Sequence, residues 1–76
     1  MTDREWLAYF GINLMEILEE AKMTQRELAD TAGISEASLC KYINGHQMPG
    51  VRAIINIADA LNCDVSELID FGDRIK

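Results

Sequence analysis

The sequence of 76 residues predicts an all-α fold, with five helices in one domain. Three observations support this fold class. Apolar residues recur at steps of three and four along most of the chain, the spacing that gathers them on one side of a helix. Ser, Thr or Asp precedes several of these segments, where each can cap a helix. One Pro and dispersed Gly leave room for several helices, and no repeat or linker divides residues 1–76.

The first predicted helix covers residues 2–22, and Thr2 or Asp3 can cap its start. Gly11 interrupts its pattern at a cost of about 1 kcal/mol relative to Ala, which leaves open a kink or two shorter helices. Five apolar residues recur on one face of this segment: Leu7, Phe10, Leu14, Ile17 and Ala21.

Two short helices follow, joined by a tight turn. Thr24 and Glu27 have the spacing of a capping box, so a helix is expected to start at Gln25 and to end at Gly33. Ser35 is a good cap for the next helix, which runs to about residue 44. A helix pair with a Gly-containing turn is the shape that offers one helix to the DNA major groove.

Two more helices are expected in the last third of the chain. Pro49 suits the first position of a fourth helix, and Asp64 can cap a short fifth one. Residues 72–76 read as a polar tail. The apolar residues expected to face the core are Val51, Ile54, Ile55, Ile57, Ala58 and Leu61 in the fourth helix, and Val65, Leu68, Ile69 and Phe71 in or after the fifth.

The helix after the turn has one polar side. Ala37, Ser38 and Lys41 share that side, while Leu39 and Tyr42 share another. Lys41 could bond guanine, Glu36 could accept from a cytosine amino group, and Ala37 could touch a thymine methyl. Each residue also has a simpler reading. Glu36 is stabilised by its helix terminus, Lys41 can simply be solvated, and Ser35 acts as a cap.

Other function classes find little support. Cys40 and Cys63 fall in apolar helical patterns, where a reduced Cys behaves as a small hydrophobe, and with His46 they would supply only three zinc ligands at no familiar spacing. We therefore expect no metal site, no cofactor, no catalytic residue and no small-molecule substrate. The chain has no run of about 18 apolar residues and no secretory signal pattern, so we expect no membrane contact and a cytoplasmic location.

The chain resembles the helix-turn-helix domain of phage Cro and cI-type repressors, the Xre-like family, over roughly residues 12–69. The resemblance implies a lambda-repressor-like fold in which residues 1–11 are an N-terminal helical extension. The residues that carry it, in order, are Thr24-Gln25, Glu27-Leu28-Ala29, Gly33-Ile34-Ser35, Ser38-Leu39, Asn44-Gly45, Pro49, Ala58 and Ala60-Leu61.

The resemblance also implies roles for individual residues, with residues 35–44 as the recognition helix in the major groove of double-stranded DNA. The positions implied to read bases are Ser35, Glu36, Ala37, Ser38 and Lys41. Those implied to contact phosphates are Gln25, Arg26, Asn44, His46, Gln47 and Arg52. The chain departs from the family pattern at His46 and Gln47, where relatives tend to carry Lys or Arg, and at Leu18 and Ile43, where many carry an Arg–Glu pair.

Charge weakens the DNA-binding prediction, because the net charge is −6. Residues 22–52 hold four basic and three acidic residues, a net of +1, whereas the rest holds three basic and ten acidic residues. Few phosphate contacts imply weak binding by one copy, so two copies on a palindrome, with recognition helices about 34 Å apart, are expected. Trp6, Tyr9 and Phe71 could form the dimer surface or could enlarge the core.

Two functions therefore remain. The first is a sequence-specific DNA-binding transcriptional regulator, expected to be a homodimeric repressor. The alternative is a protein-interaction module of the same fold, such as an antirepressor or antitoxin-type component, with little affinity for DNA. The acidic net charge and Glu36 on the groove-facing side favour this alternative.

Overall fold

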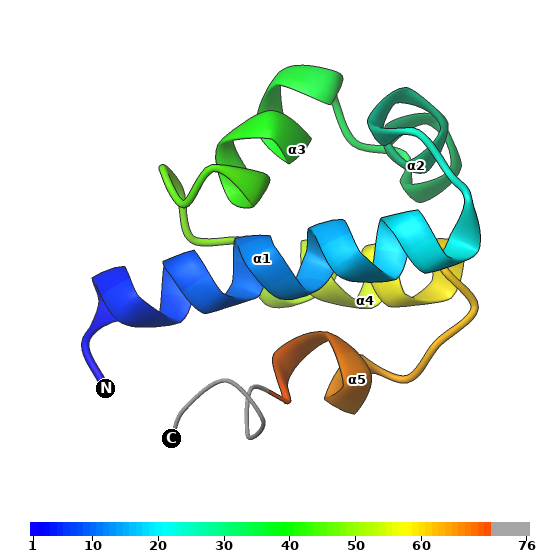
Figure 1. Cartoon of the computed structure of the whole chain (residues 1–76). Coiled ribbons are helices and arrows are strands. Elements are labelled where there is room, and N and C mark those ends of the chain that lie inside the picture. The colour runs from blue at the N-terminus through cyan, green and yellow to red at the C-terminus, as the bar shows by residue number, and fades with distance from the viewer. Residues whose placement is uncertain (71–76) are drawn as a thin grey trace.

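The computed structural model describes residues 1–70 and contains five α-helices and no strand within that range, which confirms the predicted fold class (Figure 1). The helices are α1 (Asp3–Ala21), α2 (Gln25–Ala32), α3 (Glu36–Ile43), α4 (Val51–Ala60) and α5 (Val65–Ile69). In the view of Figure 1, α1 crosses the molecule, α2 and α3 lie above it, α4 lies behind it and α5 lies below.

The core receives side chains from all five helices. Burying each large apolar side chain contributes about 2 kcal/mol to folding. The fully buried large side chains are Phe10 and Leu14 of α1, Leu28 of α2, Leu39 of α3, Ile57 of α4 and Leu68 of α5.

Helix α1 begins with a capping box that joins Thr2 to Glu5. The Glu5 backbone N–H donates to Thr2 Oγ1 at 3.1 Å, and the Thr2 N–H donates to the Glu5 carboxylate at 3.1 Å. These bonds lower the pKa of Glu5, with the bond from the Thr2 backbone as the main cause. Thr2 rather than Asp3 is therefore the cap.

Gly11 does not interrupt α1, which runs unbroken from Asp3 to Ala21, so the expected alternative of two shorter helices is wrong. A Cβ at this position would overlap the backbone carbonyl of Ile43, at the end of α3. The glycine therefore serves the close approach of two helices. The expected inner face of α1 is also wrong at one position, because Ala21 lies exposed at the helix end. Leu18, one turn earlier, is buried instead.

The first aromatic residues pack inward. Trp6 stacks on Phe10, with ring centroids 5.1 Å apart and ring planes 9° from parallel. Both Trp6 and Tyr9 are half-buried and pack against the core. This packing indicates that Trp6 and Tyr9 enlarge the small core, and it disfavours the alternative that they form a dimer surface. Phe71 and the tail 72–76 lie outside the described residues.

The start of α4 differs from the expectation. Gly50 is the N-cap, and its carbonyl accepts the first helical bond, from the Ile54 N–H at 3.0 Å. Pro49 is buried ahead of the cap and is not the first helical residue. Val51 and Ile55, both expected to face the core, are 75% and 42% exposed. Only part of the apolar stripe of α4 therefore reaches the core.

Helix α5 is held by a side chain of α1. Asn13 is buried, and its Nδ2 donates to the backbone carbonyls of Glu67 and Leu68 at 2.9 and 2.7 Å. Asp64 occupies the N-cap position of α5, as expected, but its side chain makes no capping hydrogen bond. Ile69, expected to face the core, is 41% exposed.

We expect Gly11→Ala to lower the free energy of unfolding by at least about 2 kcal/mol, because the added methyl overlaps the Ile43 carbonyl. That figure is the net change, because the steric cost outweighs the gain of about 1 kcal/mol that Ala brings to a helix interior relative to Gly. Urea unfolding followed by circular dichroism measures the difference. The control is Ala8→Gly, an exposed site in the same helix, where only the propensity cost of about 1 kcal/mol is expected. Stabilisation by Gly11→Ala would contradict the close approach of α1 and α3.

Asn13→Ala should destabilise the fold by about 1–2 kcal/mol, because two backbone carbonyls of α5 lose their donor. Asn56→Ala is the control. Asn56 is half-buried in α4, and its side chain makes no hydrogen bond to another described residue. That control should change stability by only a few tenths of a kcal/mol. Equal effects of the two substitutions in urea unfolding would show that Asn13 does not anchor α5.

Candidate nucleic-acid interface

Residues close in sequence fix the start and the end of α2, the first helix of the α2–α3 pair. Thr24 and Glu27 form the predicted capping box, with bonds of 3.0 and 3.1 Å. The bond from the Thr24 backbone is the main cause that lowers the pKa of Glu27, so this carboxylate stays charged at the positive end of α2. Gly33 ends α2 in the left-handed conformation, with φ of 72°, as predicted.

The turn between the helices is anchored to the body of the protein. The Ile34 N–H donates to the Ala29 carbonyl at 3.0 Å, and the Ile34 side chain is half-buried against the core. Leu39 and Tyr42 bury the inner side of α3, as predicted. These contacts leave the opposite side of α3 facing away from α1 (Figure 1).

The outer side of α3 is exposed and polar. Of the five residues expected to read bases, Ser38 is half-buried and the others are exposed: Ser35, Glu36, Ala37 and Lys41. One continuous surface therefore carries a carboxylate, a methyl, a hydroxyl and an ammonium group. We call these five residues, together with Cys40, the α3 face.

Ser35 and Ser38 are coupled by the cap of α3. The Ser38 N–H donates to Ser35 Oγ at 3.0 Å, and Ser35 Oγ donates to Ser38 Oγ at 2.9 Å. Ser35 is thus the predicted cap, and its hydroxyl hydrogen is already used. Because Ser38 Oγ acts as the acceptor in this pair, its own hydrogen remains available for an outside partner.

Cys40 is exposed, so its expected place in an apolar helical pattern is wrong. It lies four residues after Glu36 and three after Ala37, the spacing that places it beside them on one side of a helix. Asn44 closes this row, because its Nδ2 lies 2.9 Å from the Cys40 carbonyl oxygen and 3.2 Å from Cys40 Sγ. The helical spacing was the signal that could have identified Cys40 as part of the α3 face.

The residues expected to contact phosphates divide into two groups. Arg26, His46, Gln47 and Arg52 are exposed. The other two have side chains engaged within the protein. Gln25 is half-buried, with Nε2 3.8 Å from Met15 Sδ, and the Asn44 amide is bonded to Cys40.

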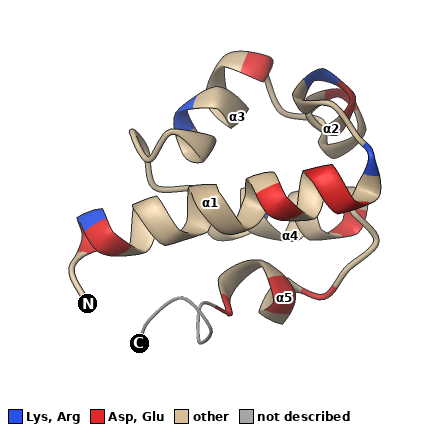
Figure 2. Cartoon of the chain, in the orientation of Figure 1, with Lys and Arg blue, Asp and Glu red and all other residues tan. Residues whose placement is uncertain are grey.

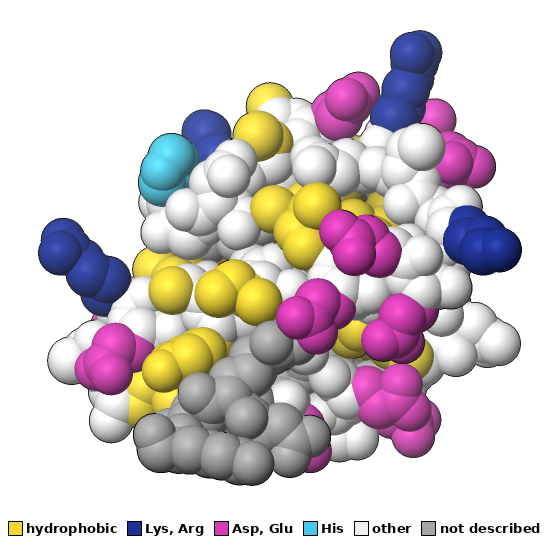
Figure 3. Space-filling view, viewed as in Figure 1, with side chains coloured by type: hydrophobic (Ala, Val, Ile, Leu, Met, Phe, Trp, Pro, Cys, Tyr) yellow, Lys and Arg dark blue, Asp and Glu magenta, His cyan; other side chains and the backbone are white. Residues whose placement is uncertain are grey.

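Acidic residues are concentrated away from the α2–α3 pair. Figure 2 shows most of them on α1, on α5 and on the segments next to α5. Helix α3 carries Glu36 in its first turn and Lys41 in its last turn. The space-filling view shows most acidic side chains down the right flank, with others at the top and at the lower left, and the single His beside a basic side chain at the upper left (Figure 3). The α3 face is therefore the less acidic end of an acidic molecule.

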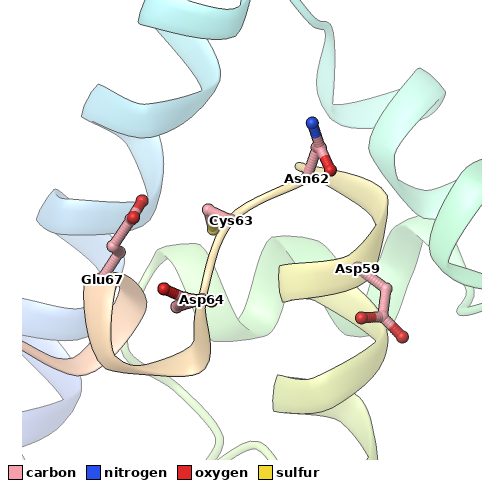
Figure 4. A pocket seen from close by; sticks show the side chains of 5 residues that line it. All are labelled: Asp59, Asn62, Cys63, Asp64 and Glu67. Carbon is pink, nitrogen blue, oxygen red and sulfur yellow. The ribbon is translucent and has the colours of Figure 1, made fainter.

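A hollow of about 220 Å³ lies at the opposite side, around the α4–α5 connection. Its lining side chains come from residues 59–67 and include Asp59, Asp64 and Glu67 around Cys63 (Figure 4). Burial raises the pKa of the Cys63 thiol, and the carboxylates of Glu67 and Asp64 raise it further. Within residues 1–70, no three His, Cys, Asp or Glu side chains are grouped to hold a metal ion. The negative lining disfavours a phosphate or another anion here.

None of the helices in the described range is long and apolar enough to cross a membrane.

Comparisons with known proteins agree with this architecture. A model of the helix-turn-helix family matches residues 14–68. The chain is 42% identical over 45 residues to the cryptic phage CTXphi transcriptional repressor RstR of Vibrio cholerae, covering 59% of this chain and 40% of that protein. It is 30% identical over 60 residues to the uncharacterized HTH-type transcriptional regulator YqaE of Bacillus subtilis, covering 79% and 52%. The chain thus spans about half or less of the curated relatives it matches.

A solved structure is also similar. The crystal structure of the restriction-modification controller protein C.AhdI from Aeromonas hydrophila superposes with a TM-score of 0.80 at 26% identity, covering 82% of this chain and 94% of that one. The fold therefore extends over nearly the whole of that protein.

The two cysteines should react at different rates with a thiol reagent. Cys40 is exposed, whereas Cys63 is half-buried and has a raised pKa. Because the thiolate is the reactive species, Cys40 should be modified first, by about tenfold or more in rate at pH 8. Alkylation with N-ethylmaleimide, followed by mass spectrometry of peptides, measures both rates in one sample. Faster modification of Cys63 would contradict the exposure of the α3 face.

Proposed function

Because the chain belongs to the helix-turn-helix family, we propose that it is a sequence-specific DNA-binding transcriptional regulator that places α3 in the major groove. The observation that carries this proposal is the α3 face: an exposed polar side directly opposite the buried Leu39 and Tyr42. A helix that reads base edges needs an exposed polar side, because the DNA must be able to approach it without displacing another part of the protein. Action on DNA also agrees with the cytoplasmic location expected from the sequence.

Base reading is assigned to the α3 face. Lys41 donates to the O6 and N7 acceptors of guanine, and Ser38 has a hydroxyl hydrogen for an acceptor. Glu36 accepts from the amino group of cytosine, and the Ala37 methyl packs on a thymine methyl. Ser35 contributes mainly by holding Ser38 in place.

Phosphate contacts are assigned first to the exposed side chains of Arg26, His46 and Gln47. Gln25 and Asn44 can join them only if each gives up the internal hydrogen bond it makes in the free protein. So few cationic contacts imply modest non-specific affinity and a shallow dependence of binding on salt. Arg52, in the first turn of α4, is also exposed and is a further candidate.

We further propose that the regulator is a homodimeric repressor that blocks access to a promoter. A single α3 contacts only a few base pairs, whereas two copies related by a twofold axis read a palindrome with half-sites one helical turn apart. The name of the Vibrio cholerae relative supports the sign of regulation.

The second candidate function is a protein-interaction module that retains the fold. The observation that favours it is electrostatic, because the net charge is −6 and Glu36 is exposed on the α3 face. Acidic residues repel DNA, although a Debye length of about 8 Å at physiological salt limits the range of this repulsion.

Selection from a random duplex library separates the two functions. At about 50 mM salt, where phosphate contacts are strong, the chain should enrich a short palindromic sequence. Lys41→Ala and Glu36→Ala should each relax the preference at one base pair of each half-site, with a loss of about 5–150-fold in affinity for the selected site. Arg26→Ala should weaken all sequences alike and reduce the salt slope by about 1. Arg4→Ala, at the exposed start of α1, should leave binding unchanged.

A thiol measurement on the same samples adds an independent readout. Bound duplex should protect Cys40 from alkylation and leave the rate at Cys63 unchanged, because only Cys40 lies on the α3 face. Failure to retain any duplex at low salt would support the protein-interaction function. Binding that is insensitive to both α3 substitutions would refute the assigned base-reading residues.

A further inference from the structure

Exposed apolar side chains gather at the start of α4. Six large hydrophobic residues in the described range are exposed, and three of them lie here: Met48 at 45%, Val51 at 75% and Ile55 at 42%. Helix α4 packs against α2 and α5, and its buried residues, Ile57 and Ala58, belong to the side that these helices cover. Val51 and Ile55 are four residues apart, so they lie on one side of α4, and both are exposed.

Two opposite charges flank Ile55 along α4. Arg52 precedes Ile55 by three residues and Asp59 follows it by four, so all three side chains lie on the same side of α4. Both charged residues are exposed, and neither forms an ion pair with another described residue. They are about 10.5 Å apart along the helix axis, too far to pair with each other.

This order of charge, apolar residue and opposite charge is complementary to itself when reversed. If two copies of α4 lie antiparallel about a twofold axis near Ile55, each Ile55 meets its counterpart and each Arg52 meets Asp59 of the second copy. A parallel arrangement would instead place like charges together, which is unfavourable. We propose that this side of α4, comprising Val51, Arg52, Ile55 and Asp59, is the contact between two copies of the chain, packed antiparallel. The inference rests on the proposed function in taking a second copy as the partner.

A twofold axis in one particular direction would also suit a palindromic duplex. For two antiparallel helices side by side, the axis that exchanges them is perpendicular both to the helices and to the line joining them. Helix α4 runs across the view in Figure 1, and α3 lies above it. If the axis points from α4 toward the level of α3, both copies of α3 lie on the same end of the dimer. That is the arrangement a palindromic duplex requires.

The proposal changes the expected role of Arg52. The resemblance to repressors implied a phosphate contact for this residue, but it shares a side of α4 with Ile55 and Asp59. We assign its guanidinium to Asp59 of the second copy. Because the contact is small, association without DNA should be weak and should need high concentration to observe.

Charge reversal tests the pairing on the full chain in the absence of DNA. Sedimentation equilibrium up to about 1 mM should show a monomer–dimer equilibrium for the wild type. Arg52→Asp and Asp59→Arg should each weaken dimerisation by about tenfold, because both opposite-charge pairs become like-charge pairs. An equimolar mixture of the two variants should recover the dimer, because the heterodimer restores both pairs. Arg4→Asp is the matched control at a distant exposed site and should behave as the wild type.

Ile55→Asp tests the apolar centre and should abolish the dimer without rescue by either charge variant. Thermal unfolding checks that all variants fold, which is expected because every substituted side chain is exposed. A wild type that stays monomeric at every concentration would overturn the proposal. So would a dimer that ignores these substitutions, or a mixture that fails to recover. Dimer recovery in a protein that selects no duplex would overturn the proposed function alone.

Discussion

The position of α3 depends on the close contact between α1 and the end of α3. Gly11 lets the backbone carbonyl of Ile43 approach α1 more closely than any side chain would allow. A Cβ added to Gly45, just after α3, would lie 3.7 Å from the backbone of Leu7, so a second point near the end of α3 also rests on α1. Residues 1–11, expected to be an extension, are therefore continuous with α1 and help to seat α3. The inner side of α3 is fixed by backbone packing, and its outer side is free to carry function.

The surface is divided so that each region suits a different partner. The α3 face has mixed charge and small polar groups, which match the edges of bases rather than the phosphate backbone. Most carboxylates lie on α1 and α5, where they would keep the far side of the molecule away from a duplex (Figure 2). Such a protein would gain specificity from base contacts and little affinity from bulk electrostatics. A second copy would double the base and phosphate contacts, which is why the side of α4 around Ile55 matters to the proposed mechanism.

The candidate site shows how far helical spacing alone can be taken. Spacing correctly placed Lys41 on an exposed side and Leu39 on a buried one, because a helix of eight residues has only one inner side. It did not place Cys40, whose apolar character suggested burial. It also did not show that the side-chain amides of Gln25 and Asn44 donate hydrogen bonds to Met15 and Cys40. Side-chain hydrogen bonds of this kind depend on the rotamers that neighbours allow, and a sequence pattern does not contain them.

Local sequence signals were enough to predict the number of helices and most of their ends, because a cap acts on residues within four positions of it along the chain. Thr24 with Glu27, Gly33 and Ser35 each satisfy or release backbone groups at a helix terminus, whatever the rest of the fold does. The packing of the helices was needed to show which apolar residues are buried and why position 11 requires a glycine. Those outcomes depend on elements that lie far apart in sequence, as when the carbonyl of Ile43 reaches α1, and local propensity carries no information about such contacts.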